Sequence, residues 1–426
     1  MKFVFLHPCR GFPIIQRYQL GLFAIITSLR AQGHDAYYLP VTDTSIEIDE
    51  EIDVIGIYTI DCMLPYIKDL ADKYKKNHII MLGGPTATIA PEHCKQETYF
   101  DLLFQGDDIQ SILTFANSEG KDTSSFWFGE AKVNYSTQEG IDQLDILDKC
   151  EYLEDLQFNY VMTYGSPYSH VYASRGCAFS CAYCSNSAYN KLGCTLRYRD
   201  PKKIVDELLA NYHLKPSIIV FEDDILTTNR RWFKQLMYEF KTRMHDPFGT
   251  LFEMNTRVNC MSKDQVELAK SCGCHCIRFG VESGTEEIRK QMNRCTMTNK
   301  DIKAFASMIV GAEINTYINS IIGVPPETPE LFEKTEQLVD EVFNISKEKG
   351  RKCTVILNTF YPLMGTPLYD YCVTNDLIEK RLKGIAAHVS YALKEKYITR
   401  KYILEKQKLF RDKYKGMISL DGSHYA

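Results

Sequence analysis

The amino-acid sequence predicts an α/β protein in which an N-terminal doubly wound (Rossmann-like) parallel sheet is followed by a partial (β/α)6 barrel with a helical C-terminal extension. Three observations predict this fold. Apolar strand-like segments alternate with helix-like segments over about the first 115 residues, the alternation resumes at residue 171 for six repeats, and most strand-like segments end in turns that contain Gly, Pro or acidic residues. Ligands of such folds bind at the carboxyl ends of the parallel strands.

The N-terminal elements follow from these patterns in order. We expect strands at 2–8, 35–39, 54–59, 78–82 and 100–104, with helices at 18–32, at 64–76 and after residue 108. The carboxyl ends of these strands carry four candidate ligand-binding turns, at 9–11, 59–62, 83–86 and 106–108. The domain is expected to cover residues 1–117, and a polar linker with a short hairpin is expected over 118–165.

The barrel is expected to cover residues 166–370. Its predicted strands lie at 171–174, 217–221, 251–255, 275–279, 315–322 and 354–360, and its predicted helices at 201–212, 230–244, 262–272, 301–309 and 329–347. Residues 371–426 form the predicted helical extension. Within it, the pattern over about 386–415 predicts an amphipathic helix packed on the barrel, with a lid for a partner or substrate as the alternative.

Composition narrows the functional classes. A net charge of −5 gives no support to a nucleic-acid partner, for which a basic surface is expected. No run of 18 apolar residues predicts a membrane span, and the N-terminal apolar run is too short for a signal peptide. Fifteen cysteines without a secretory segment do not predict a disulfide framework. We therefore expect a reduced, cytoplasmic protein.

The most specific motif is a cysteine cluster with C-x₃-C-x₂-C spacing, formed by Cys177, Cys181 and Cys184. Three thiolates this close in sequence can hold one polynuclear centre, and three is one short of the four that close an iron–sulfur cube. The remaining iron would then keep an open coordination position, as catalytic metals do. The alternatives are a structural zinc site or three unrelated thiols, but zinc sites usually pair C-x₂-C with a second, distant pair.

Four further stretches follow the cysteine loop in order: Phe221-Glu-Asp-Asp-Ile, Ile277-Arg-Phe-Gly-Val-Glu-Ser-Gly, Ile321-Ile-Gly-Val-Pro-Pro-Glu-Thr and Tyr361-Pro-Leu-Met-Gly-Thr-Pro-Leu. With the cysteine loop, this arrangement resembles the radical S-adenosylmethionine (SAM) superfamily, in the branch with an N-terminal cobalamin-binding-type domain. The resemblance implies a [4Fe–4S] cluster on the three cysteines, with SAM chelated to the open iron.

The resemblance and the strand-end positions together nominate a set of SAM-binding residues: Tyr183, Glu222, Asn255, Arg257, Glu282, Ser283 and Gly323. Several of these residues also fit an ordinary structural role. Glu282 could be neutralised by Arg278 or Arg257, and an aspartate after Glu222 could cap a helix. Arg257 suits a carboxylate, and it shares a strand face with Asn255. Gly323 and its prolines suit either an adenine or an ordinary tight turn.

The N-terminal domain resembles the cobalamin-binding fold through its strand-end turns, which nominate Thr59, Gly83, Gly84, Pro85, Thr86 and Gly106. Two glycines at a strand end let the backbone approach a bulky ligand. The motif Asp-x-His-x-x-Gly, which in relatives places a histidine on cobalt, is absent. The domain is therefore expected either to bind cobalamin without a protein ligand below the metal, or to serve as a scaffold.

A second cysteine group, Cys272, Cys274 and Cys276, precedes the Glu-Ser-Gly motif. An auxiliary cluster is one interpretation. The other, which the strand-like alternation favours, is that these are ordinary buried thiols.

These features predict a radical SAM enzyme that cleaves SAM to a 5′-deoxyadenosyl radical and, with cobalamin, methylates an unactivated carbon or phosphorus of a small-molecule or natural-product substrate. An electron donor such as flavodoxin or ferredoxin is the expected partner. The alternatives are a radical rearrangement or atypical SAM cleavage without methyl transfer, with or without cobalamin, and a corrinoid-sensing binding protein. The identity of the substrate and the oligomeric state do not follow from the sequence.

Overall fold

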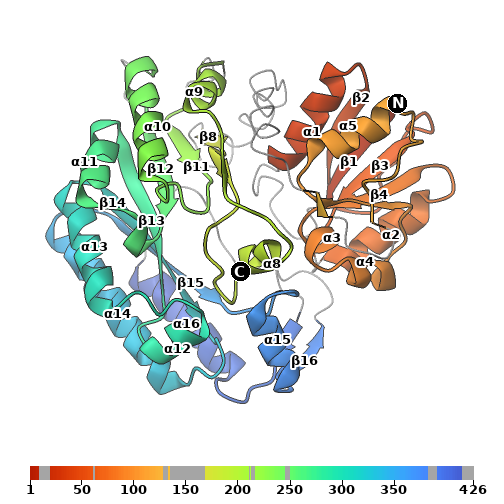
Figure 1. Ribbon diagram of the computed structural model, residues 1–426. Coiled ribbons are helices and arrows are strands. Elements are labelled where there is room, and N and C mark those ends of the chain that lie inside the picture. The colour runs from red at the N-terminus through yellow and green to blue at the C-terminus, as the bar shows by residue number, and fades with distance from the viewer. Residues whose placement is uncertain are drawn as a thin grey trace.

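The computed structural model describes residues 1–8, 20–60, 63–127, 133–134, 168–210, 212, 216–244, 250–381 and 391–414. Within these residues the chain forms two α/β units that lie beside each other (Figure 1). The predicted turns at 9–11 and 61–62, and most of the predicted linker, lie outside the described residues.

The N-terminal unit is a five-stranded sheet with strand order β2-β1-β3-β4-β5 and parallel pairing throughout. Its strands are β1 (Lys2–Pro8), β2 (Asp35–Val41), β3 (Val54–Tyr58), β4 (Ile79–Gly83) and β5 (Leu102–Leu103). The strand order reverses between β1 and β3, and such a reversal opens a ligand crevice at the carboxyl ends of the strands. The predicted doubly wound sheet is confirmed.

Helices cover both faces of this sheet: α1 (Leu20–Ala31) and α5 (Ile109–Asn117) on one, α2 (Leu64–Tyr74) and α4 (Pro91–Glu97) on the other. Alternate residues of β1 explain why both faces are apolar, because Phe3 and Phe5 pack under α1 and α5 while Val4 and Leu6 pack under α2. The last helical turn of α1 closes at Gly33, whose φ is +83°.

The N-terminal unit extends beyond the predicted boundary at residue 117. Phe126 and Trp127 are buried in the two cores of this unit, and the backbone N–H of Trp127 donates to the carbonyl of Leu103 at 2.8 Å. A short strand, β7 (Val133–Asn134), also pairs with β6 (Gln105–Gly106). Residues through at least Trp127 therefore belong to this unit, because their apolar side chains complete its cores.

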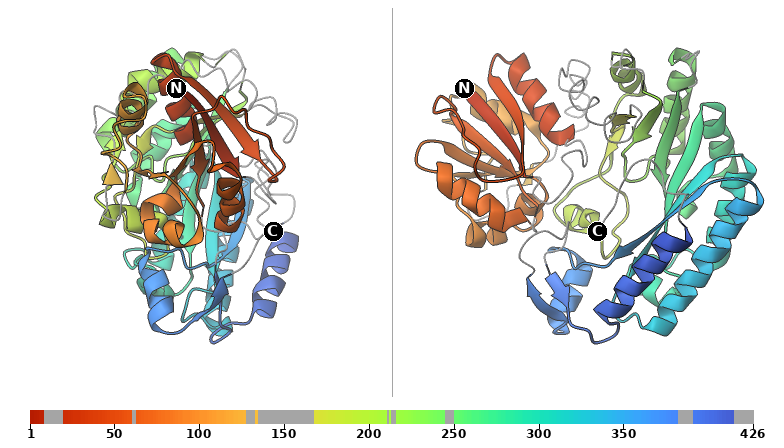
Figure 2. Two further views of the ribbon diagram at one scale, coloured as in Figure 1. Left: turned by 90° about the vertical axis from the view of Figure 1, so that its right-hand side faces the viewer. Right: turned by 180° about the vertical axis from the view of Figure 1, so that it is seen from behind.

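The second unit is a six-stranded parallel sheet with order β15-β14-β13-β12-β11-β8, as predicted for the partial barrel. Its strands are β8 (Tyr168–Val171), β11 (Ile218–Phe221), β12 (Leu251–Thr256), β13 (Cys274–Glu282), β14 (Asn315–Ile322) and β15 (Cys353–Thr359). The helices between them lie on the outer side of the curved sheet (Figures 1 and 2). They are α9 (Pro201–Ala210), α10 (Arg230–Arg243), α11 (Lys263–Ser271), α13 (Asn299–Gly311) and α14 (Pro329–Glu348).

Several short elements escaped prediction because each has too few residues for a periodic pattern. They are α3 (Pro85–Ile89), β9 (Ser174–Arg175), α8 (Ser185–Lys191), β10 (Arg197–Tyr198), η4 (Val258–Cys260), α12 (Glu286–Gln291) and α15 (Pro367–Thr374).

The C-terminal extension is not wholly helical. An antiparallel pair, β16 (Ile378–Arg381) and β17 (Tyr391–Leu393), precedes α16 (Arg400–Lys413), and residues 382–390 lie outside the described residues. The helix packs on the barrel as predicted. Phe410 is buried in the barrel core, Lys406 pairs with Glu336 of α14 at 2.6 Å, and the Gln407 amide donates to the Thr359 hydroxyl at 2.9 Å.

The two units are joined by an interdomain clamp, which consists of Asp107, Arg175 and Arg197. Arg197 donates through both terminal nitrogens to the two carboxylate oxygens of Asp107, each at 3.0 Å, and Arg175 donates to the same carboxylate at 3.3 Å. Asp107 directly follows β6 of the first unit, while the arginines belong to β9 and β10 of the second. Bidentate Arg–carboxylate pairs fix geometry as well as charge.

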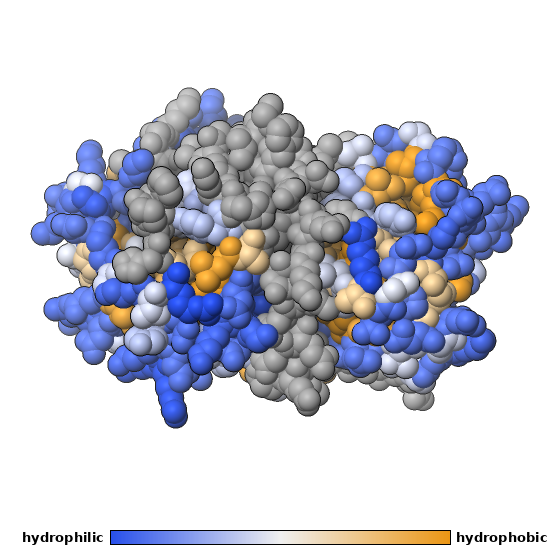
Figure 3. Space-filling view, turned by 90° about the horizontal axis from the view of Figure 1, so that it is seen from above, coloured by the Kyte–Doolittle hydropathy of each residue, from blue (hydrophilic) through white to orange (hydrophobic). Residues whose placement is uncertain are grey.

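Seen from above, the outer surfaces of both units are mostly hydrophilic, with separate apolar patches (Figure 3). Within the described part of the chain, no helix is both long enough and apolar enough to cross a membrane.

Candidate active site

The three motif cysteines lie on the loop between β9 and α8, at the carboxyl end of β8 and on the inner side of the curved sheet. Hydrogen bonds from distant segments hold this loop. The Ala182 N–H donates to the Met292 carbonyl at 3.0 Å, and Asn293 donates to the Ser180 carbonyl at 2.7 Å. Asn190 of α8 donates to the Cys177 carbonyl at 3.1 Å. The cysteine backbone is therefore fixed by α8 and by the end of α12.

Gly176 immediately before Cys177 is required by this geometry. Its φ is +83°, and a Cβ there would lie 2.7 Å from the Thr195 carbonyl oxygen. Only glycine combines that backbone conformation with that close approach.

Cys177 and Cys181 are buried and Cys184 is partly buried. Burial raises the pKa of Cys177 to about 12 and that of Cys184 to about 11. Without metal these two side chains are neutral thiols at pH 7, so metal binding must release their protons.

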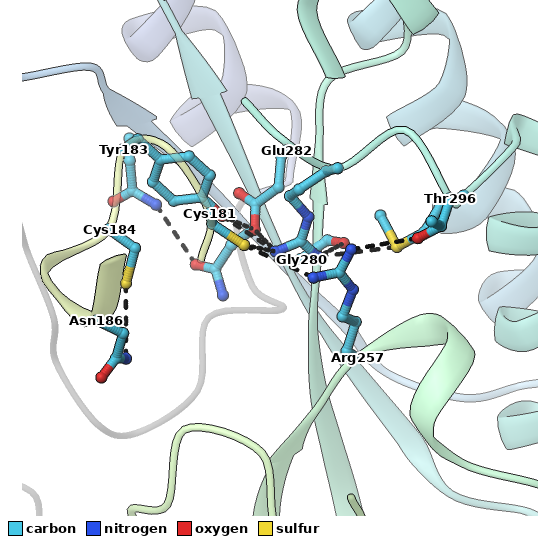
Figure 4. A network of polar contacts seen from close by, with 12 residues as sticks. Cys181, Tyr183, Cys184, Asn186, Arg257, Gly280, Glu282 and Thr296 are labelled. Atoms are coloured by element: carbon cyan, nitrogen blue, oxygen red, sulfur yellow. Dashed lines mark hydrogen bonds and ion pairs between the residues drawn. The ribbon is translucent and has the colours of Figure 1, made fainter. Parts of the chain in front are cut away.

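Two guanidinium groups approach the sulfur of Cys181 (Figure 4). The nearest nitrogens of Arg257 and Arg294 lie 3.7 Å and 3.8 Å from that sulfur. The Arg257 guanidinium also lies over the ring of Phe179, at 4.2 Å from the ring centroid. Both arginines are buried.

Glu282 accepts from the Tyr183 hydroxyl at 2.8 Å and lies 3.2 Å from Arg294, which itself donates to the Tyr183 oxygen at 3.1 Å. The sequence offered Arg278 or Arg257 as the residue that could neutralise Glu282, but in the structure Arg294 does so. Arg278 instead donates to Glu253, which neutralises it on the neighbouring strand.

A β-bulge aims the Glu282 side chain. The register of β13 against β14 shifts between Gly280 and Glu282, and Glu282 has a φ of +60°. Non-glycine residues in that region carry strain, of order 1–3 kcal/mol, that the surrounding structure must hold. Gly280 makes room for the result, because a Cβ there would overlap the Glu282 carboxylate.

The three acidic residues at the end of β11, Glu222, Asp223 and Asp224, have different surroundings. Glu222 lines the cavity and contacts His170 Nδ1 at 2.6 Å. Asp223 is buried and accepts from the Ala173 N–H at 3.0 Å, and burial raises its pKa to about 6. Asp224 lines the cavity, where burial raises its pKa. No aspartate of this group caps the following helix, because Asn229 is the N-cap of α10; that alternative was wrong.

The remaining predicted SAM residues have different positions. Asn255 and Arg257 both line the cavity, as expected from their shared strand face, and the Asn255 amide donates to the Asp223 carbonyl at 3.0 Å. Gly323, with a φ of +90°, also lines the cavity. Ser283 does not, which corrects its nomination. Its hydroxyl is fully buried at 3.3 Å from that of Thr335, because the chain turns outward after the bulge.

These residues surround one cavity of about 1030 Å³ inside the barrel. The cysteine loop forms one end. The opposite wall comes from β14, β15 and the C-terminal extension, through Tyr317, Asn319, Asn358, Thr359, Tyr361, Tyr397, Ile398, Ile403, Leu404 and Gln407. Amide, hydroxyl and aromatic groups on this wall suit a polar organic molecule.

The residues nominated for cobalamin cluster at the carboxyl edge of the N-terminal sheet, but they do not all face outward. The Thr59 hydroxyl donates to the Gly83 carbonyl at 2.7 Å and accepts from the Ala87 N–H at 2.9 Å, so this buried side chain holds the turn. Thr86 is also buried, and these two nominations are corrected to structural roles.

Gly83, Gly84, Pro85 and Gly106 are partly exposed at this edge. Gly84 has a φ of +102° and faces the Tyr58 ring closely, whereas a Cβ on Gly83 would meet no atom within 4 Å. The open space at Gly83 would let the backbone approach a large flat ligand closely.

The sequence reading missed several site residues. Arg294 follows a short helix with no strand-end signal, and Asp107 looked like part of a turn. His7, at the end of β1, contacts the Tyr38 hydroxyl at 2.8 Å, and its ring lies edge-on to Tyr58. Burial lowers the pKa of His7 to about 4, so it is neutral at pH 7. In the sequence, only the position of His7 at the end of a predicted strand marks it as a candidate site residue.

The second cysteine group is part of the core. Cys272 and Cys274 are buried in the barrel core, and the Cys272 thiol donates to the Met237 carbonyl at 3.5 Å. The surroundings of these two thiols are apolar core side chains of the barrel, and neither thiol lines the cavity. The structure favours buried thiols over an auxiliary cluster.

Comparison with known proteins agrees with this geometry. Residues 171–362 match the family model of the radical SAM superfamily. An uncharacterized methyltransferase of Pyrococcus horikoshii is 24% identical over 329 residues, covering 73% of this chain and 67% of its own. An anaerobic magnesium-protoporphyrin IX monomethyl ester cyclase of Rubrivivax gelatinosus is 25% identical over 292 residues, covering 63% of this chain and 50% of its own. The chain thus spans between half and two thirds of the length of these relatives.

Two solved structures share the fold over most of the chain. OxsB, a cobalamin-dependent SAM radical enzyme solved with aqua-cobalamin, superposes with a TM-score of 0.71 at 15% identity, over 97% of this chain and 67% of its own. TsrM of Kitasatospora setae, a radical SAM methyltransferase solved with cobalamin and a [4Fe–4S] cluster, gives 0.67 at 14% identity, over 88% of this chain and 75% of its own.

Fold and site together define an enzyme in which three cysteines of one loop line the cavity of a partial barrel, and a Rossmann-like domain precedes that barrel in the chain. Residues 171–362 of this chain form a radical SAM domain, and the chain shares the fold of OxsB and TsrM over most of its length. Such a domain implies a [4Fe–4S] cluster on Cys177, Cys181 and Cys184, with SAM beside it.

The donor set fits the cluster. Cys177, Cys181 and Cys184 all line the same cavity, and three thiols from one loop are the protein ligands that an iron–sulfur cube with one open iron requires. The Arg257 Nε is buried and has no hydrogen-bond partner in the described part of the chain, so the protein presents a cation there to an incoming anion.

Proposed function

We propose that this protein is a cobalamin-dependent radical SAM methyltransferase acting on an unactivated carbon or phosphorus of a small-molecule or natural-product substrate. The observation that carries the proposal is that the barrel cavity, with its cysteine loop, lies next to the carboxyl edge of the N-terminal sheet, where Tyr172 of the cavity lining interacts with Tyr58.

Contacts across the two units support this arrangement. Tyr172, which lines the cavity, interacts electrostatically with Tyr58 at the end of β3, and burial together with this interaction and that of Glu222 raises the pKa of Tyr172. The interdomain clamp connects the Gly106 turn with the residues just before Cys177. A corrin held at Gly83 and Gly106 would therefore lie beside the substrate cavity.

The cavity is also large enough for the reaction. Its volume, about 1030 Å³, is at the upper end of the range for small-molecule sites. SAM would occupy the end formed by Tyr183, Glu222, Asn255 and Arg257, and the substrate would occupy the wall formed by β15 and α16, which Gly323 faces through Ile403.

When bound, the cluster and SAM supply a 5′-deoxyadenosyl radical, cobalamin supplies a methyl group, and a donor such as flavodoxin or ferredoxin supplies the electron. The protein's own residues orient and shield these reactants. Arg294 and Tyr183 hold the Glu282 carboxylate in place, and the partly buried apolar side chains of Ile398 and Ile403 shield the cavity wall that the C-terminal extension contributes.

A second candidate is a radical rearrangement or ring closure without methyl transfer. It is supported by the relative named as a cyclase, whose match covers 63% of this chain. Products made from SAM with an isotopically labelled methyl group distinguish the two, because methyl transfer places label in the substrate, whereas a rearrangement leaves it only in methionine.

Cobalamin binding is tested separately. After anaerobic incubation with hydroxocobalamin and desalting, we expect near-stoichiometric corrin absorbance. The Gly83→Leu variant should lose at least nine tenths of it, because a Cβ at this position meets no described atom within 4 Å and the added side chain would extend into the proposed ligand space. Gly311→Leu, also at a glycine with open surroundings but in the barrel, is the matched control and should bind like the native protein. An absence of corrin in the native protein rejects the cobalamin proposal.

A further inference from the structure

Arg257 differs from the other cavity arginines in its charge partners. Arg294 lies 3.2 Å from Glu282, and Arg278 pairs with Glu253. Arg257 is buried like Arg294 and more deeply than Arg278, but within the described part of the chain it has no carboxylate at ion-pair distance. A buried cation without a counter-charge is strongly unfavourable, so an anion is required next to it.

The anion that the fold supplies is the sulfur of Cys181. The Arg257 terminal nitrogen lies 3.7 Å from it, within the distance of an N–H···S hydrogen bond. A cluster-bound cysteine is a thiolate, so cluster binding gives Arg257 its missing counter-charge.

The cysteine loop also positions the guanidinium. Phe179, two residues before Cys181, lies under it at 4.2 Å, and the other terminal nitrogen of Arg257 donates to the Thr296 hydroxyl at 3.4 Å. The ring provides a cation–π contact that orients the guanidinium toward the sulfur. The same loop thus contributes both the sulfur and the ring that holds the cation against it.

We propose that Arg257 tunes the reduction potential of the cluster, by holding its positive charge and an N–H donor against the Cys181 sulfur. Reduction adds one negative charge to the cluster, and hydrogen bonds to the ligand sulfurs and nearby cations stabilise that charge. In this step an external one-electron donor is oxidised and the cluster is reduced by the same single electron, with no covalent bond made or broken. Arg294 contributes less, since Glu282 already offsets its charge.

The proposal concerns the cluster alone, so it stands whether or not the enzyme transfers a methyl group. The experiment is an anaerobic potentiometric titration of the reconstituted full-length protein with dithionite and mediators, without SAM, in which the reduced cluster is followed by its electron paramagnetic resonance signal. Iron content establishes that each variant carries a complete cluster.

We expect Arg257→Gln to lower the equilibrium constant for reduction by about tenfold or more, which corresponds to about 59 mV for a one-electron couple. Arg278→Gln is the matched control. It removes the same charge from the same cavity without touching a cysteine, and we expect a change of less than about twofold.

Two results would overturn the proposal. The first is a potential in Arg257→Gln equal to that of the native protein, and if SAM binding is weaker in the same variant, Arg257 is a SAM ligand only. The second is an equal shift in both variants. If Arg257→Gln does not retain a cluster, Arg257→Lys decides, because lysine keeps the charge but loses the planar contact. The proposal then expects about a threefold drop, and an unchanged potential rejects it.

Discussion

Removing the carboxylate of the interdomain clamp tests how strongly the two units are coupled. In Asp107→Ala, Arg197 loses a bidentate partner, with both bonds at 3.0 Å, and Arg175 loses a third contact at 3.3 Å. The Arg197 side chain is only 7% exposed, so its charge would remain buried without that partner.

Breaking one side of a fully buried ion pair costs about 3–5 kcal/mol. The Asp107 side chain is 21% exposed, and solvent therefore screens part of the interaction. We expect Asp107→Ala to lower the free energy of unfolding by about 2–3 kcal/mol, measured by urea denaturation.

The neighbouring residue provides a matched control. Asp108 caps α5 within its own unit by accepting from the Ser111 N–H at 3.2 Å, so Asp108→Ala should cost about 1 kcal/mol. Hydrogen exchange separates the two effects. Asp107→Ala should increase exchange both in the Gly106 turn and in residues 172–200 around the cysteine loop, whereas Asp108→Ala should increase it only in α5 and its turn. Equal stability losses, with no change in exchange at the cysteine loop of Asp107→Ala, would refute the coupling.

Three more predictions follow. Cys181→Ala should abolish both iron incorporation and 5′-deoxyadenosine formation, and persistence of both, measured by iron assay and chromatography, would contradict the cluster assignment. Cys274→Ala should leave iron per chain unchanged and lower stability by only about 1–2 kcal/mol because its thiol is a core group; a loss of iron would instead support a second cluster. Glu327 is fully buried, and burial raises its pKa to about 8 from an ordinary 4.5. Between pH 4.5 and pH 8 the folded state therefore holds a proton that the unfolded state has released. The stability that this proton contributes is complete below pH 4.5 and is lost as the pH rises through 8. The free energy of unfolding of the native protein, relative to that of Glu327→Gln, should fall by about 2–3 kcal/mol from pH 5 to pH 7. Parallel urea-denaturation curves of the two proteins over that range would contradict this.

The sheets were predictable because parallel strands buried on both faces leave long apolar runs in the sequence. β1 and β14 illustrate this, with six of seven and six of eight residues buried respectively. The cysteine loop was predictable for another reason, since three ligands of one cluster must be close along the chain when one loop supplies them.

The contacts across the site were not predictable. Arg294 lies 113 residues from Cys181, and no local pattern marks an arginine as the partner of Glu282. The error about Ser283 has a definite cause. The bulge at Gly280–Glu282 breaks the alternation of sides, so the residue after the motif glutamate turns away from the cavity. Likewise, the β16–β17 pair within the helical extension was not predicted, because it is too short to leave a pattern.

The wall contributed by α16 has a consequence for biosynthesis. The three cysteines and all six strands of the barrel precede this helix in the chain, so a ribosome releases the cluster loop long before residues 398–407. Any folding intermediate in which α16 has not yet docked therefore lacks the cavity wall beside β15. Docking of α16 then closes the compartment through Lys406 and Gln407. The cysteine loop is therefore synthesised before α16, the helix that completes the cavity around it.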